Sequence, residues 1–126
     1  MQDIIAALKP YESYIRIREH EPMAHHTTFR IGGPADLFLG CASGAPLEEI
    51  VPIIRGAGVP LYVVGRGSNL LVHDEGVRGV VLCTAEMHEI TVSGSTIRAE
   101  AGASLFSIAS CALRQGLGGA EFAAGI

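Results

Sequence analysis

The spacing of hydrophobic residues along the chain predicts three short helices. Between residues 46 and 56, apolar side chains recur every three or four positions and would form one face of a helix. Pro46 suits the first position of this helix, but Pro52 lacks an N–H group and should kink the helix or split it. The same spacing predicts helices over residues 3–9 and from the cap residue Ser104 to Gly116.

Strands are predicted where apolar residues alternate with polar ones or form short unbroken runs. They are expected over residues 14–19, 35–41, 61–65, 70–73, 79–83, 88–92 and 96–101. The helix at 46–56 and the strands on either side of it make a βαβ unit, so these strands should pair in parallel, with a right-handed crossover. A glycine between two serines at residues 93–95 predicts a hairpin turn. This mixture indicates an α+β chain with two lobes that join near residues 82–90.

Composition and charge exclude several classes of function. The formal net charge is −4 and the isoelectric point is near 5.7, which argues against a nucleic-acid partner or an anionic membrane surface. No apolar run approaches the roughly 20 residues of a membrane span, and the N-terminus does not resemble a signal peptide. Cys41, Cys83 and Cys111 lack metal-binding spacing and are expected to be buried, reduced thiols, so a cytoplasmic protein is expected.

The sequence contains only weak candidates for a metal site or a nucleophile. His25 and His26 are adjacent and would point in different directions, so a solvated or hydrogen-bonded pair is favoured over a zinc site. The run His73-Asp74-Glu75 falls at a predicted turn and is expected to be solvated. Ser68 lies in no nucleophile motif, and no His–Asp pair is placed to activate it. No metal ligand and no catalytic residue is therefore assigned.

The segment Gly-Arg-Gly-Ser-Asn at residues 65–69 is the strongest candidate for ligand binding. Gly65 and Gly67 permit unusual backbone dihedral angles and let a ligand approach the N–H groups, which together could bind an anion. The hydroxyl of Ser68 and the amide of Asn69 add side-chain donors. The segment matches neither the P-loop nor the Rossmann fingerprint. The residues alone therefore slightly favour an ordinary turn over an anion-binding loop.

Five motifs occur in one order along the chain and together carry a family resemblance. They are HTTFRIGGPAD (26–36), VVGRGSNLLV (63–72), EGVRGVV (75–81), AGASL (101–105) and GAEFAAGI (119–126). From about residue 20 to its end, the chain resembles the UDP-N-acetylenolpyruvoylglucosamine reductases, bacterial flavoenzymes of peptidoglycan synthesis. The resemblance implies an FAD-binding domain of the vanillyl-alcohol-oxidase type, in which FAD lies between two small α+β lobes. It would divide the chain into an N-terminal helix and extended arm (1–24), a first FAD-binding lobe (25–84) and the incomplete start of a second lobe (85–126).

The resemblance also implies which residues would contact FAD. Backbone N–H groups of the 65–69 segment would hold the diphosphate, the segment Ala101–Ala103 would pass close to the flavin ring, and the last two residues would begin a further cofactor loop. The implied cofactor-binding residues are Gly65, Arg66, Gly67, Ser68, Asn69, Leu70, Ala101, Gly102, Ala103, Gly125 and Ile126. Replacement of Gly67 by valine is expected to abolish flavin retention in the full-length enzyme while leaving that enzyme folded.

In the complete enzyme of this family, NADPH would reduce FAD, and reduced FAD would deliver a hydride to the enolpyruvyl group of a UDP-sugar to give UDP-N-acetylmuramate. The family's catalytic arginine, serine and glutamate would lie beyond Ile126, so the chain is interpreted as C-terminally truncated and inactive by itself. Its exposed apolar end could also drive self-association. Two alternatives stay open, a non-catalytic nucleotide- or phosphate-binding module that uses the same loop and an inert folded piece.

Overall fold

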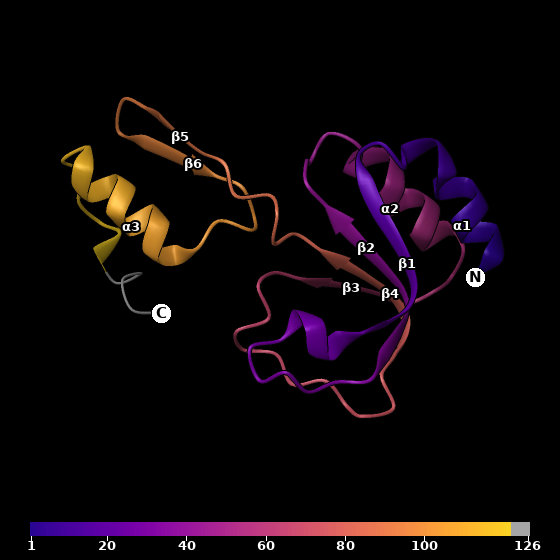
Figure 1. The fold of residues 1–126 in the computed structure, drawn as a ribbon. Coiled ribbons are helices and arrows are strands. Elements are labelled where there is room, and N and C mark those ends of the chain that lie inside the picture. The colour runs from indigo at the N-terminus through magenta and orange to yellow at the C-terminus, as the bar shows by residue number, and fades with distance from the viewer. Residues whose placement is uncertain (122–126) are drawn as a thin grey trace.

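The computed structural model describes residues 1–121, which form two parts joined by residues 84–89 (Figure 1). The first part contains α1 (Gln2–Leu8), β1 (Ile15–Pro22), β2 (Pro34–Cys41), α2 (Leu47–Gly56), β3 (Leu61–Val64) and β4 (Val77–Cys83). The second part contains β5 (Ile90–Ser93), β6 (Thr96–Ala99) and α3 (Leu105–Arg114). A short 3₁₀ helix, Met23–His26, follows β1. The mixed α and β content agrees with the sequence pattern.

Three of the four strands in the first part run parallel to one another. The strand order is β1-β2-β4-β3, with β1 antiparallel to β2 and with β2 and β3 each parallel to β4. The predicted βαβ unit is present as β2, α2 and β3, but the prediction that its two strands pair is wrong, because β4 lies between them. The second part contains the predicted antiparallel hairpin, in which Ser93 pairs with Thr96.

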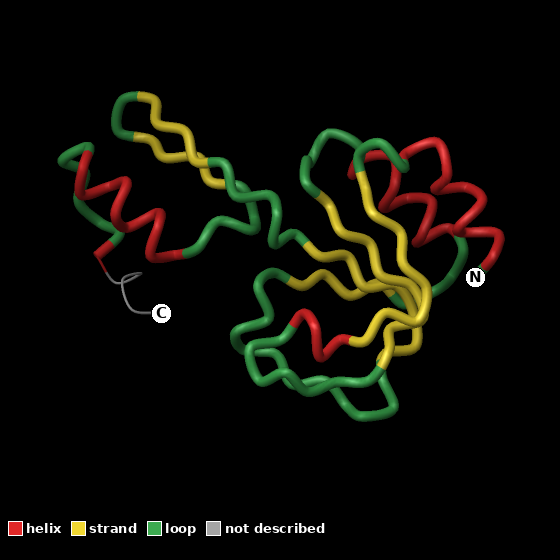
Figure 2. Tube along the Cα trace, in the orientation of Figure 1, coloured by secondary structure: helices red, strands yellow, loops and turns green. Residues whose placement is uncertain are grey.

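The two faces of the sheet are covered in different ways. Side chains alternate along β2, so Leu37 and Leu39 face the helices, whereas Phe38 faces the opposite side. Figure 2 shows α1 and α2 on one side of the sheet and mostly loops on the other. The helix side buries Ile4, Leu8, Ile15, Leu37, Leu39, Cys41, Ile50, Ile54, Val80, Leu82 and Met87. The loop side buries a smaller set, Met23, Ala35, Phe38, Val72, Val81 and Cys83, which anchors the loops that follow β1 and β3.

Two predicted details of the secondary structure are wrong. The segment 70–73 is not a strand, because it crosses the loop side of the sheet and pairs with none of the strands within residues 1–121. Only its Val72 is buried, and Leu71 is 75% exposed. The predicted split of the helix at Pro52 is also wrong, because α2 continues through this residue without a break. Pro52 and Glu48 are both exposed, so water can hydrogen-bond the carbonyl that Pro52 leaves unpaired.

The three cysteines are buried free thiols, as the sequence predicts. Burial, with a smaller contribution from Cys83, raises the pKa of the Cys41 thiol to about 11. This thiol is therefore protonated and a poor nucleophile at neutral pH. Within residues 1–121, no helix has the length and apolar character that crossing a membrane would require.

Candidate functional site

The 65–69 segment begins where β3 ends, beside the end of the parallel strand β4. In Figure 1 both strands point toward the hairpin and α3. The carboxyl ends of parallel strands are the usual place for a ligand in α/β sheets, because loops diverge there and leave a crevice. A cavity of about 280 Å³ lies at this position, lined by Gly65 and Arg66, by residues 25–28 and by Cys83 and Ala85.

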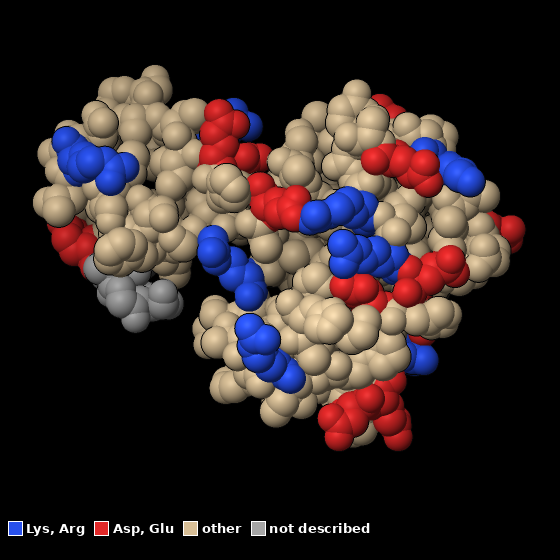
Figure 3. Space-filling model, viewed as in Figure 1, with Lys and Arg blue, Asp and Glu red and all other residues tan. Residues whose placement is uncertain are grey.

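The backbone of the 65–69 segment offers unused hydrogen-bond donors. None of its five N–H groups donates a hydrogen bond to an atom of residues 1–121. Ser68 and Asn69 are exposed, and the Arg66 guanidinium forms no ion pair with a residue in this range. Figure 3 shows both basic and acidic side chains beside the indentation between the two parts of the chain. These donors and this charge suit an anionic ligand.

The two glycines of the segment have different roles. Gly67 has a φ of +72°, its carbonyl accepts a 3.1 Å hydrogen bond from the N–H group of Thr28, and a Cβ there would collide with the carbonyl of His26. A Cβ on Gly65 would meet nothing within 4 Å. A valine at Gly67 would therefore strain the contact with residues 26–28 even without a ligand, so loss of flavin in that variant would not by itself identify a diphosphate contact.

Hydrogen bonds through a turn at residues 84–87 connect the alanine–glycine–alanine segment (101–103) to the end of β3, where the 65–69 segment begins. The N–H group of Gly102 donates to the carbonyl of Met87 at 2.7 Å, and a Cβ on Gly102 would collide with the carbonyl of Thr84. The N–H group of Thr84 donates in turn to the carbonyl of Val64, immediately before the 65–69 segment, at 2.9 Å. The structure thus connects two segments that are 32 or more residues apart in the sequence.

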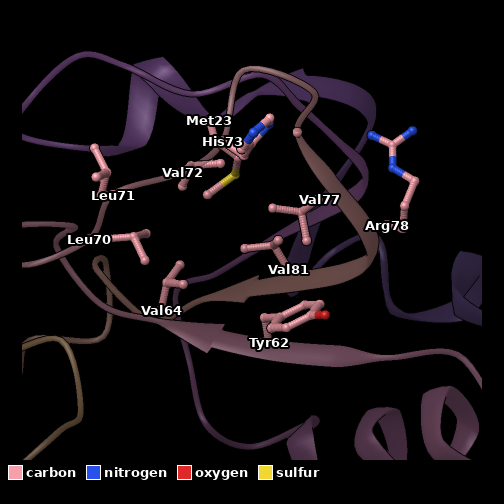
Figure 4. Close-up of a pocket in the computed structure, with 11 residues that line it drawn as sticks. Met23, Tyr62, Val64, Leu70, Leu71, Val72, His73, Val77, Arg78 and Val81 are labelled. Atoms are coloured by element: carbon pink, nitrogen blue, oxygen red, sulfur yellow. The ribbon is translucent and has the colours of Figure 1, made fainter.

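Other implied site residues lie elsewhere. Leu70 lines a second cavity of about 410 Å³ on the loop side of the sheet, with Tyr62, Val64 and Val81 among its apolar neighbours (Figure 4). It is not among the residues that line the cavity beside Gly65. Gly125 and Ile126 lie outside the described residues, as does the end through which self-association was expected. Within residues 1–121, no group of three or more histidine, cysteine or carboxylate side chains is arranged to hold a metal ion.

The sequence motifs missed a polar cluster behind the cavity. The Glu21 residue is only 9% exposed, and its Oε1 lies 3.0 Å from Nε2 of His26 and 3.0 Å from Nη1 of Arg18. The ring of His26 also stacks on Phe38, with 3.9 Å between ring centroids. His25, by contrast, is exposed. The only signal in the sequence is a glutamate followed four and five positions later by histidines, which does not by itself predict burial.

Residues 35–126 match the family model described as FAD binding domain. The chain therefore belongs to this family of FAD-binding domains, and the fold class implied by the motifs is confirmed. Among curated relatives, UDP-N-acetylenolpyruvoylglucosamine reductase 2 of Symbiobacterium thermophilum is 48% identical over 112 residues, which cover 88% of this chain and 36% of the relative. The UDP-N-acetylenolpyruvoylglucosamine reductase of Moorella thermoacetica is 45% identical over 112 residues, with 89% and 37% covered.

Solved structures agree with these relatives. The crystal structure of UDP-N-acetylenolpyruvylglucosamine reductase (MurB) from Thermus caldophilus superposes with a TM-score of 0.68 at 32% identity, over 90% of this chain and 39% of that one. CrmK, a flavoenzyme of caerulomycin biosynthesis, gives a TM-score of 0.65 at 17% identity and supports the fold alone. The resemblance that the motifs carry is thus confirmed. The chain spans little more than a third of the length of the curated relatives it matches.

Proposed function

We propose that the chain binds FAD and is the FAD-binding portion of an NADPH-dependent reductase that converts UDP-N-acetylglucosamine enolpyruvate to UDP-N-acetylmuramate. One observation carries the binding site. The 65–69 segment presents five N–H groups without partners in residues 1–121, at the carboxyl ends of two parallel strands and beside an open cavity. In a member of the FAD-binding domain family, the cofactor's diphosphate is the anion that this arrangement suits.

In this proposal each segment has a definite task. The N–H groups of 65–69 and the charge of Arg66 hold the diphosphate, and the small residues Ala101–Ala103 leave room for the flavin ring. Residues 25–84 and 85–126 then contribute to two FAD-binding lobes. Bound FAD supplies hydride transfer, and this chain's own residues bind and orient it. We assign no catalytic residue to the chain.

The overall reaction belongs to the proposal as well. The relatives' names support a UDP-sugar substrate, and NADPH as hydride donor fits a reductase of this kind. We infer that the reaction takes place in the cytoplasm, where NADPH and nucleotide sugars are available. The chain by itself is expected to bind cofactor without turning over the substrate.

The visible spectrum of the purified chain tests cofactor binding. We expect flavin absorbance after purification, or after incubation with FAD and removal of the excess. A colourless chain that binds ADP but not FAD would instead favour a non-catalytic nucleotide-binding module. A folded chain that binds neither would refute the proposed site. Reductase activity is tested separately, with a complete polypeptide of the relatives' length that carries this sequence.

A further inference from the structure

We propose that His26, held in place by the buried carboxylate of Glu21, forms a second wall of the diphosphate site and donates a hydrogen bond to the bound diphosphate. The inference rests on the function proposed for the 65–69 segment. It adds a side chain that the FAD-binding motifs do not assign. The ligand chemistry is that of a diphosphate, either free or esterified in a dinucleotide.

The ring of His26 is fixed from two directions. Its Nε2 atom lies 3.0 Å from Oε1 of Glu21, and its plane stacks on Phe38 with an interplanar angle of 20°. Glu21 is itself held by a second hydrogen bond from Arg18. A ring that is already ordered loses little conformational freedom when it binds a ligand, so its hydrogen bond contributes more to affinity.

The main chain of His26 belongs to the same site. Its carbonyl lies against Gly67, where no Cβ would fit, and the neighbouring Thr28 donates its N–H group to the carbonyl of Gly67. His26 lines the cavity together with Gly65 and Arg66. His26 and the start of the 65–69 segment therefore line one cavity, and the contacts at Gly67 hold residues 26–28 against that segment.

Charge explains why an anion would engage this ring. The cavity lining described above includes Arg66 and two histidines but no carboxylate. The titratable and charged groups around His26 are Glu21 and Arg18 from β1, the adjacent His25, Cys83 at the end of β4, and Arg66. Because Nε2 is engaged by Glu21, the ring can donate to an anion through Nδ1 only when it is protonated. An anion that accepts from Nδ1 would therefore favour the ring with both nitrogens protonated, which a glutamine in its place cannot reproduce.

Calorimetric titration of ADP into the 126-residue chain, from about pH 6 to about pH 8, tests the proposal. His26→Gln keeps a donor for Glu21 but cannot carry a charge, and His88→Gln removes an exposed histidine that does not line the cavity. ADP itself gains a proton near pH 6, so the variants are compared with the wild type at the same pH. We expect His26→Gln to weaken ADP binding about tenfold relative to the wild type near pH 6 and by less near pH 8, while His88→Gln changes the affinity at neither pH. Wild-type affinity and pH dependence in His26→Gln would overturn the proposal.

A second measurement separates this inference from the proposed function and does not depend on a variant that folds. Inorganic pyrophosphate is titrated into the unmodified chain while the His26 ring is followed by NMR. Saturable shifts of that ring in a chain that binds no FAD would support His26 and refute the FAD proposal. FAD binding without any response of the His26 ring to pyrophosphate would support the FAD proposal and refute the role of His26. A chain that binds neither FAD nor pyrophosphate would overturn both.

Discussion

Gly65 and Gly67 show how two identical residues in one motif can have different physical roles. In the sequence, both glycines explain equally well how a phosphate could approach the backbone. In the structure, Gly67 is needed because residues 26–28 lie against it, whereas Gly65 borders open space beside the cavity. A side chain added at Gly65 would therefore enter the space open to a ligand, so Gly65 is the glycine whose substitution should affect binding directly.

This difference predicts opposite effects of substitution. Gly67→Ala should lower the free energy of unfolding by about 1–3 kcal/mol, because a positive φ and a collision with the His26 carbonyl must both be accommodated. Gly65→Val should change it by less than about 0.5 kcal/mol but weaken FAD and ADP binding. Urea unfolding and ligand titration measure the two effects. Full stability in Gly67→Ala, or full affinity in Gly65→Val, would contradict the assignment.

Glu21 gives the fold a dependence on pH. Burial alone would raise the pKa of Glu21, but the hydrogen bonds from His26 and Arg18 and their charges outweigh it and hold this pKa below its ordinary value of 4.5. A lowered pKa stabilises the fold above the unfolded-state value, and this contribution is lost as the pH falls through the folded-state value. We expect the wild type to lose stability below about pH 4.5 more steeply than Glu21→Gln. Parallel curves of urea midpoint against pH would show that Glu21 is not stabilised in its ionised form.

At the scale of elements, the local sequence pattern predicted the helices and the hairpin, whose formation depends on residues close together in the sequence. The helices α2 and α3 and the β5–β6 hairpin follow from apolar spacing, a serine cap and a glycine turn. The insertion of β4 between β2 and β3 was not predictable, because strand order depends on packing between distant segments. The 65–69 segment was found because a glycine-rich turn after an apolar strand is a local signal. The contact between Glu21 and His26 was missed, because it forms only when the loop after β1 folds onto Phe38.

The cap of α3 is a local feature that can be measured by itself. The Oγ atom of Ser104 accepts a 3.0 Å hydrogen bond from the N–H group of Ser107. Ser104→Ala should therefore lower the free energy of unfolding by about 1 kcal/mol. Ser110→Ala, inside the same helix, is the matched control and should change it by less than about 0.5 kcal/mol. Equal losses in the two variants, read from urea unfolding, would mean that the cap contributes nothing specific.

At the scale of the whole molecule, the turn at residues 84–87 connects the two parts and both candidate ligand segments. Its backbone forms hydrogen bonds with Val64, just before the 65–69 segment, and with Gly102 in the alanine–glycine–alanine segment. Its Glu86 forms an ion pair with Arg16 of β1. The proposed FAD site requires both segments in a fixed relation, because diphosphate and flavin belong to one cofactor. The turn is thus the element on which the relative position of the two segments depends.

Gly102→Ala tests this dependence. The added Cβ would collide with the carbonyl of Thr84, so the contact between the hairpin part and the turn must open. Relative to the wild type, we expect hydrogen exchange to become faster in β5, β6 and α3 and to stay the same in the sheet. FAD should also bind more weakly, although the 65–69 segment itself is unchanged. Gly56→Ala is the control, because a Cβ there meets nothing within 4 Å. Wild-type exchange and FAD affinity in Gly102→Ala would show that the two segments act independently. In that case the 84–87 turn would serve only as a connection, and FAD would itself have to order the two parts when it binds.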